Sequence, residues 1–108
     1  MMYEIVFAQT AETDLQEIVD YIFRVLDNRQ AAERLLEELD QRLEQISHHP
    51  ETHPLVSDDH LRQQGIRLFT VGNCLGFYRI RNDERTVTIL RLLYGRRDWI
   101  SLLSDEDR

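Results

Sequence analysis

The spacing of apolar residues in the N-terminal half predicts one strand followed by two helices. Alternation over residues 3–7 is typical of a short strand, and helical spacing begins after Thr10, an acceptable N-cap. The helical spacing breaks at Asp27 and resumes after Asn28, which can cap a second helix. So short a break predicts an antiparallel helical hairpin. We expect its two apolar stripes to belong to the core: Leu15, Ile18, Val19, Ile22, Phe23, Leu26, Ala32, Leu35, Leu36, Leu39, Leu43 and Ile46.

Three apolar runs in the C-terminal half predict an antiparallel meander. The joints between them, Gly72-Asn73 and residues 82–85, are short enough for hairpin turns. The segment from His49-Pro50, which ends the second helix, to Gly65 is polar, and we expect it to be an exposed connection. The three predicted strands span residues 66–71, 75–81 and 86–94.

The last predicted strand is apolar on both faces, which indicates a central strand covered on both sides. We expect the helices to cover one side and a further element or a partner to cover the other. The fold class is therefore α+β in the order β-α-α-β-β-β, with a mainly antiparallel four-stranded sheet, a helical hairpin on one face and a short C-terminal segment. Strict alternation places Val87, Ile89, Arg91 and Leu93 on one face and Leu90, Leu92 and Tyr94 on the other.

The size and composition of the chain limit the number of domains and the cellular compartment that we expect. A length of 108 residues predicts a single domain over residues 1–108. The apolar runs fall far short of the ~20 residues that span a bilayer, and no basic segment precedes an apolar core at the N-terminus. The single cysteine, Cys74, cannot form an internal disulfide, which agrees with a reducing compartment. We expect a cytoplasmic protein that does not bind membranes.

Charge divides the chain into an acidic half and a basic half. All thirteen basic residues are arginine, and the net charge is −7. Residues 1–61 carry a net charge of −10, whereas residues 62–97 carry +6 from eight arginines and two acids. A partner of the basic half is expected to offer carboxylates or phosphates.

The arginines of the basic half are the first candidates for binding. Arg91 interrupts an apolar strand, where a cation needs solvent, a carboxylate or a phosphate as a partner. A structural pairing of Arg91 with Asp98, or of Arg97 with an Asp, is the alternative to a binding role. The candidate set joins strand arginines to a cluster of planar donors beside aromatic rings, and comprises Arg67, Arg79, Arg91, Tyr94, Arg96, Arg97 and Trp99.

Other site chemistry finds little support in the sequence. The four histidines lie between His48 and His60, but no spacing typical of a zinc site accompanies them. No P-loop, nucleophile elbow or dinucleotide-binding glycine pattern is present. Cys74 has no histidine after it in the chain and is expected to be a buried thiol. We therefore expect neither a metal nor a cofactor.

Three motifs together resemble the RelE/ParE toxin superfamily, and most closely its plasmid-stabilisation, ParE-like branch. They are A-x-x-D-L-x-x-I-x-x-Y at Ala11–Tyr21, Gly65-Ile66-Arg67, and I-L-R-L-L-Y-G-R-R-D-W at Ile89–Trp99. The resemblance covers nearly the whole chain. It implies the toxin of a type II toxin-antitoxin system, which arrests growth unless a cognate antitoxin neutralises it. It also implies that a flexible, acidic antitoxin arm covers Arg67, Arg91 and Arg97, and that operator DNA is contacted only through the antitoxin.

The resemblance leaves two targets open, DNA gyrase and the ribosome. Ribosome-dependent mRNA cleavage needs a base and an acid in addition to cations. The chain has no lysine, its last histidine is His60, and Leu102-Leu103 stand where a tyrosine might be expected in RNA-cleaving relatives. Only Arg67, Arg91, Tyr94 and Arg97 remain as candidates for such an RNase. We therefore favour gyrase poisoning, a binding activity rather than catalysis. A third possibility is a non-toxic partner of the antitoxin in operator binding.

Overall fold

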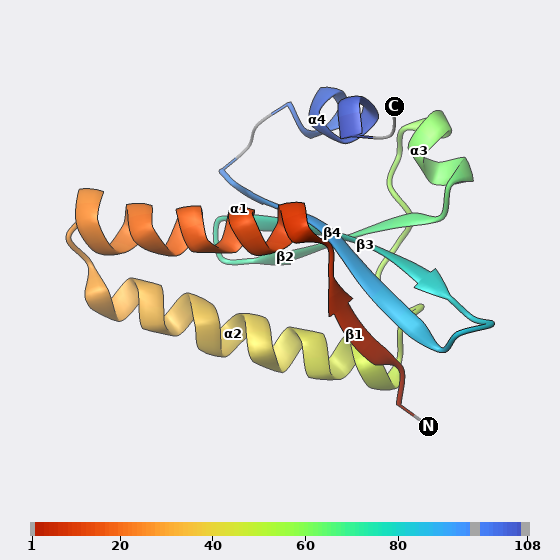
Figure 1. Cartoon of the computed structure of the whole chain (residues 1–108), viewed down its shortest axis with the longest axis horizontal. Helices are drawn as coiled ribbons and strands as arrows, with labels where there is room; N and C mark the ends of the chain where they lie inside the picture. Colours follow the sequence, from red (N-terminus) through yellow and green to blue (C-terminus); the bar gives the residue numbers. More distant parts are fainter. Residues whose placement is uncertain (1, 96–97, 107–108) are drawn as a thin grey trace.

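A computed structural model describes residues 2–95 and 98–106 of the chain (Figure 1). It confirms the expected α+β class and the order of the main elements. Two short helices add to that order, one before the meander and one at the C-terminal end. The elements are β1 (Glu4–Phe7), α1 (Gln9–Asp20), the π-helix η1 (Tyr21–Val25), α2 (Arg29–His48), α3 (Asp59–Gln63), β2 (Ile66–Val71), β3 (Cys74–Arg81), β4 (Thr86–Tyr94) and α4 (Trp99–Glu106).

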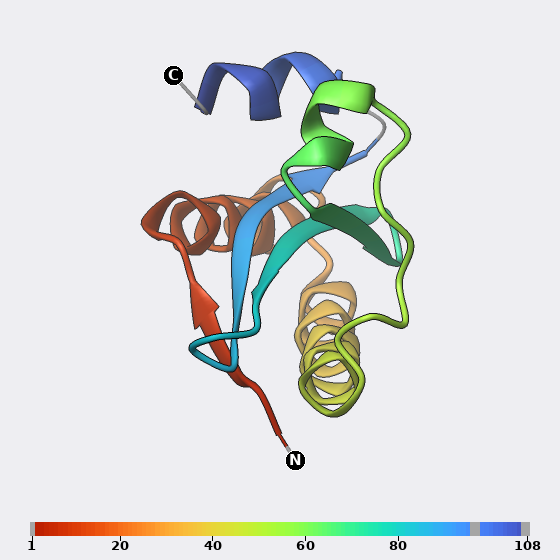
Figure 2. The same cartoon turned by 90° about the vertical axis from the view of Figure 1, so that its right-hand side faces the viewer.

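The four strands form one sheet in the order β1-β4-β3-β2. β1 runs parallel to β4, and the other neighbouring strands are antiparallel. α1 and α2 lie side by side, and Figure 2 shows α3 and α4 together on the side of the sheet opposite to α2. The sheet therefore has a helical layer on one face and a smaller cover on the other. No helix in residues 2–95 and 98–106 is long and apolar enough to cross a membrane.

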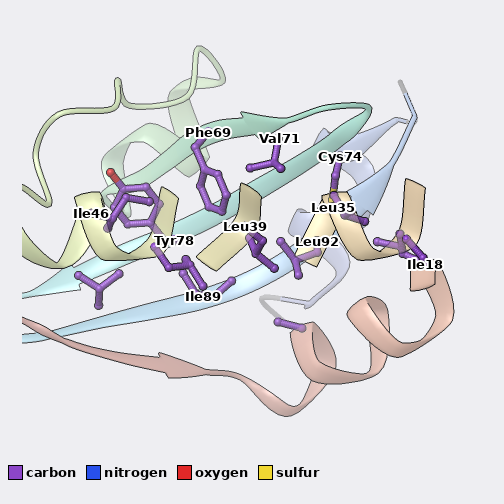
Figure 3. Packing of buried hydrophobic residues seen from close by; sticks show 14 of the residues in the cluster. Ile18, Leu35, Leu39, Ile46, Phe69, Val71, Cys74, Tyr78, Ile89 and Leu92 are labelled. Atoms are coloured by element: carbon purple, nitrogen blue, oxygen red, sulfur yellow. The ribbon is translucent and has the colours of Figure 1, made fainter. Parts of the chain in front are cut away.

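The main core lies between the hairpin and the sheet. The helices contribute Ile18, Leu35, Leu39 and Ile46, which point toward the strand residues of Figure 3. One of these strand residues, Phe69, pairs with Gly76 on β3, and a Cβ at Gly76 would overlap the phenyl ring. The glycine therefore leaves the space that this ring occupies.

A second, smaller core covers the other face of the sheet. It consists of the buried residues Val56, Leu61, Ile66, Phe77, Leu93 and Leu103. Val56 and Leu61 come from the segment before Gly65, so the expectation that this segment is an exposed connection is wrong. Val56 and Leu61 gain more by packing against the sheet than by remaining in water. The second cover of β4 thus comes from the chain's own segments around α3 and α4.

A β-bulge at Leu90 changes which way the last strand faces. Tyr78 pairs with Ile89 and Phe77 pairs with Arg91, so Leu90 is an extra residue on β4. Leu92 accordingly joins Ile89 in the main core, while Leu90 and Leu93 pack in the second core. The faces predicted from strict alternation are therefore wrong after position 90, because one inserted residue reverses the alternation.

The hairpin departs from the sequence prediction in two places. α1 begins at Gln9, with Ala8 at the N-cap position, rather than at Thr10. Asn28 does cap α2, since its side-chain oxygen accepts a hydrogen bond from the backbone N–H of Ala31 at 3.0 Å. The apolar stripe is wider than the contact with the sheet: Ile18 and Ile22 are buried, but the exposed fractions are 48% for Phe23, 47% for Leu26 and 41% for Leu36. Placing these last three residues in the core was wrong.

Candidate functional site

The predicted arginines do not converge on one site. Arg67 alternates with Ile66 and Leu68, whose side chains pack in the second core, so it points toward the helical side of β2. There its guanidinium donates hydrogen bonds to the backbone carbonyls of His53 at 2.7 Å and Glu51 at 3.4 Å. Arg67 holds the segment after α2 against the sheet.

Arg79 faces the opposite way. It alternates with Tyr78, which is part of the main core, and it lies directly across from Thr88 on β4. Within the part of the chain that the structure describes, the side chain of Arg79 has no hydrogen bond or ion pair. Its neighbour on the same face, Arg81, pairs with Glu84 at 3.8 Å. Arg79 is therefore a half-buried cation without a carboxylate among the described residues.

Arg91 has an intramolecular partner, Asp14 of α1. Its Nε and Nη2 atoms donate to the two carboxylate oxygens at 2.7 and 3.0 Å. The Asp14 carboxylate also accepts the backbone N–H of Leu92 at 3.1 Å. The side chains of Arg91 and Asp14 are only 13% and 10% exposed, so this fork-shaped pair is largely shielded from water. The partner is not Asp98, which the sequence suggested as the structural alternative.

The position of Asp14 explains this pairing. β1 pairs with β4 only as far as Ile89, so beyond that residue the edge of β4 has no neighbouring strand on this side. Asp14 lies on the buried face of α1 with Ala11 and Ile18, at helical spacing from both. Its carboxylate covers the free strand edge and neutralises Arg91 at the same time. An acid on the apolar face of a helix was the sequence signal for this contact.

Tyr94 stands at the border of two neighbouring cavities. One cavity of about 230 Å³ lies between α1 and the free edge of β4, and its lining includes Asp14, Glu17 and Leu92. The other, about 290 Å³, lies between the helical hairpin and the turn that joins β2 to β3. The ring of Tyr94 lines both cavities and contacts the ring of Tyr21, with 5.8 Å between the ring centroids. Among the predicted site residues that the structure describes, Tyr94 thus lies at the concave surface that these two cavities form.

Trp99 belongs to the second core. Its ring contacts that of Phe77, with 5.3 Å between the centroids and 33° between the planes. This contact attaches the beginning of α4 to the sheet, so the ring is engaged in intramolecular packing. Arg96 and Arg97, the remaining predicted residues, lie outside the described residues, and their binding roles stay predictions.

Two other titratable groups, Cys74 and Tyr78, are buried in the main core. Burial, and to a lesser extent the charge of Asp14, raise the pKa of Cys74 to about 11. The thiol is therefore protonated at neutral pH and is a weak nucleophile. Tyr78 donates its hydroxyl hydrogen to the carbonyl of Pro50 at 2.7 Å, and burial raises its pKa. Among the described residues, no three His, Cys, Asp or Glu side chains are grouped so that they could hold a metal ion.

His53 gives the fold a pH dependence that can be measured. Its ring lies against those of Phe69 and Tyr78, and burial, followed by the charge of Arg42, lowers its pKa from the ordinary value of 6.5. Below pH 6.5 the unfolded chain then binds more protons at this residue than the folded chain does. We expect the free energy of unfolding to fall as the pH drops from 6.5 through the lowered pKa.

The variant His53→Gln should show a smaller loss over this pH range in urea titrations of both proteins. Identical pH dependence of the variant and the unchanged protein would contradict the prediction.

Comparison with known proteins identifies a family whose sequence model matches most of the chain. A sequence model described as "ParE toxin of type II toxin-antitoxin system, parDE" matches residues 5–99. No curated protein matches the chain significantly.

Similar solved structures include a chromosomal ParDE toxin-antitoxin system from P. aeruginosa, with a TM-score of 0.68 and 16% identity over 88% of this chain and 98% of that chain. The RelBE2 complex from Mycobacterium tuberculosis gives a TM-score of 0.61 and 21% identity, over 87% of this chain and 99% of that one. The E. coli RelBE complex gives 0.59 and 12%, over 88% and 99%. At these identities the structures show a shared fold, and the sequence match shows that the chain belongs to the ParE toxin family of type II toxin-antitoxin systems.

Proposed function

We propose that this ParE-family toxin arrests growth by binding and poisoning DNA gyrase, and that a cognate antitoxin neutralises it. The single observation that carries the choice of a binding activity is the ion pair between Asp14 and Arg91. An arginine that serves phosphoryl chemistry must present its charge to the reacting phosphate. The guanidinium of Arg91 instead forms two hydrogen bonds with a carboxylate.

Arg67, another of the candidate RNase residues, supports the same proposal because its guanidinium is engaged with two backbone carbonyls. Leu103, which stands in the region where RNA-cleaving relatives were expected to have a tyrosine, is buried in the second core. A phosphate that approached Arg91 would also meet the negative charge of Asp14, which disfavours RNA at this place. Poisoning by binding requires surface complementarity and no acid–base pair, so it is compatible with these contacts.

The basic half of the chain supports an acidic antitoxin segment as the neutralising partner. Arg79 makes no ion pair with a described residue, and Tyr94 lines a concave surface. A flexible antitoxin arm that passes over both faces of the sheet could pair a carboxylate with Arg79 on one face and place apolar side chains in the cavities beside Tyr94 on the other. Arg67 and Arg91 would then act mainly by holding the binding surface in shape.

Induction of this chain alone in bacteria tests the proposal. We expect growth arrest together with gyrase trapped on cleaved DNA, and we expect the purified protein to inhibit supercoiling by gyrase in vitro. Ribosome-positioned cuts in mRNA without trapped gyrase would overturn the proposed target. Normal growth despite folded, abundant protein would favour a role restricted to antitoxin assembly. The control is co-expression with the cognate antitoxin, which should restore growth.

A further inference from the structure

An apolar patch lies on the helical hairpin at the border of the main core. Leu15, Val19 and Phe23 follow one another at intervals of four residues along α1 and η1, and Leu36 of α2 joins them. These four residues, which we call the hairpin patch, line an open groove of about 450 Å³. Phe23 and Leu36 are 48% and 41% exposed, although their spacing is that of core residues. Apolar surface gathered in one groove is typical of interaction sites.

The π-helix lies beside the patch and carries further exposed apolar residues. In η1 the backbone N–H of Leu26 donates to the carbonyl of Tyr21 at 3.1 Å, five residues back instead of four. One extra residue per turn changes the direction of the side chains that follow. Ile22 stays in the main core, whereas Val25 and Leu26 at the end of η1 are exposed by 67% and 47%. Such π-helical turns are frequent at functional sites.

The surroundings of the patch are acidic. Residues 9–48, which contain the whole hairpin, carry ten acids and four arginines. Two of the arginines are already paired, Arg24 with Asp20 and Arg29 with Glu33. Asp40 lies one turn from Leu36 on the same face of α2 and has no ion pair within the described residues. The patch is therefore an apolar groove with excess negative charge around it.

We propose that the hairpin patch binds an amphipathic helix of another protein, whose apolar face is flanked by lysine or arginine. α1 and α2 lie side by side (Figure 1). A groove between two antiparallel helices accepts a third helix by the same side-chain interdigitation that joins the first two. Basic flanking residues would pair with the free carboxylates around the groove. A second copy of this chain would bring two acidic hairpins together, so charge favours a different partner.

A pair of model peptides tests the proposal. Both are 18-residue amphipathic helices with the same leucine face, one flanked by lysine and the other by glutamate. We measure binding to the full chain by fluorescence anisotropy of the labelled peptides and map it by NMR. We expect the lysine peptide to bind at least about tenfold more tightly than the glutamate peptide, with shifts centred on the hairpin patch.

Matched variants separate the patch from general charge attraction. Phe23→Gln and Leu36→Gln change no charge, and each should weaken binding of the lysine peptide by about tenfold. Val6→Gln alters a residue that is 40% exposed on β1, away from the hairpin, and should change the affinity by less than about twofold. Circular dichroism checks that each variant is folded. The two patch variants, Phe23→Gln and Leu36→Gln, change residues on separate helices of the hairpin.

Three results would overturn the proposal. Equal loss of affinity in Val6→Gln and Phe23→Gln would indicate unspecific attraction to an acidic protein. Equal binding of the two peptides would remove the argument from charge. A dimer of the unchanged protein in light scattering that Phe23→Gln abolishes would show that a second copy occupies the patch. None of these results depends on whether gyrase is the target.

Discussion

Replacing Asp14 with alanine is expected to lower the free energy of unfolding by about 3–5 kcal/mol, because it leaves the charge of Arg91 shielded from water without its carboxylate. The same change removes the acceptor for the backbone N–H of Leu92, which then has no partner on the free edge of β4. Urea denaturation of the variant and the unchanged protein, followed by circular dichroism, measures the difference.

Two further variants show which part of the contact is responsible. Asp14→Asn retains an oxygen that can accept the hydrogen bond from Leu92 but loses the negative charge, so its loss of stability should be smaller than that of Asp14→Ala. The double variant Asp14→Leu/Arg91→Met replaces the whole pair with apolar groups and should recover most of the lost stability. A loss of less than about 1 kcal/mol in Asp14→Ala would mean that water reaches Arg91 and that the pair behaves like one on the surface.

The second large effect is expected at Phe77, which is fully buried beneath α4. Phe77→Ala should lower the free energy of unfolding by about 3–5 kcal/mol, since it removes a phenyl ring from the second core and leaves a cavity. It should also change the emission spectrum of Trp99, the only tryptophan, whose ring contacts the deleted ring. Thermal or urea unfolding with tryptophan fluorescence records both effects.

Phe23→Ala is the matched control, because the side-chain change is the same at an exposed position of the hairpin. Its expected cost is below about 1 kcal/mol, in the range of surface substitutions. Similar losses in the two variants would mean that Phe23 is packed in solution and that the hairpin patch is closed. An unchanged Trp99 spectrum in Phe77→Ala would contradict the packing of α4 on the sheet.

Periodicity along the chain was enough to predict the two long helices and the four strands of this fold. Helical spacing predicted the two long helices, and the short joints predicted the meander, because both signals are local. The missed features depend on contacts between distant residues. The bulge at Leu90 depends on the register of β3 against β4, and the burial of Val56 and Leu61 depends on the second face of the sheet. No local pattern contains either relation.

The candidate site was less predictable for the same reason. The sequence correctly indicated that Arg91 requires a partner, but that partner lies 77 residues away on α1. Arg67 and Arg79 are twelve positions apart in sequence, yet their strands pair so that the two side chains point to opposite faces of the sheet. Charge counting identifies a basic half of the chain, whereas only the folded chain shows which of its cations face one another.

The bulge at Leu90 has a consequence for any comparison between members of this family. Before the bulge the odd-numbered positions of β4 pack in the main core, and after it the even-numbered positions do. In a relative whose last strand lacks the extra residue, a position aligned without a gap to one of residues 91–94 would belong to the opposite layer. Assignment of a role to an aligned arginine or tyrosine in this strand therefore requires knowing whether the relative carries the insertion.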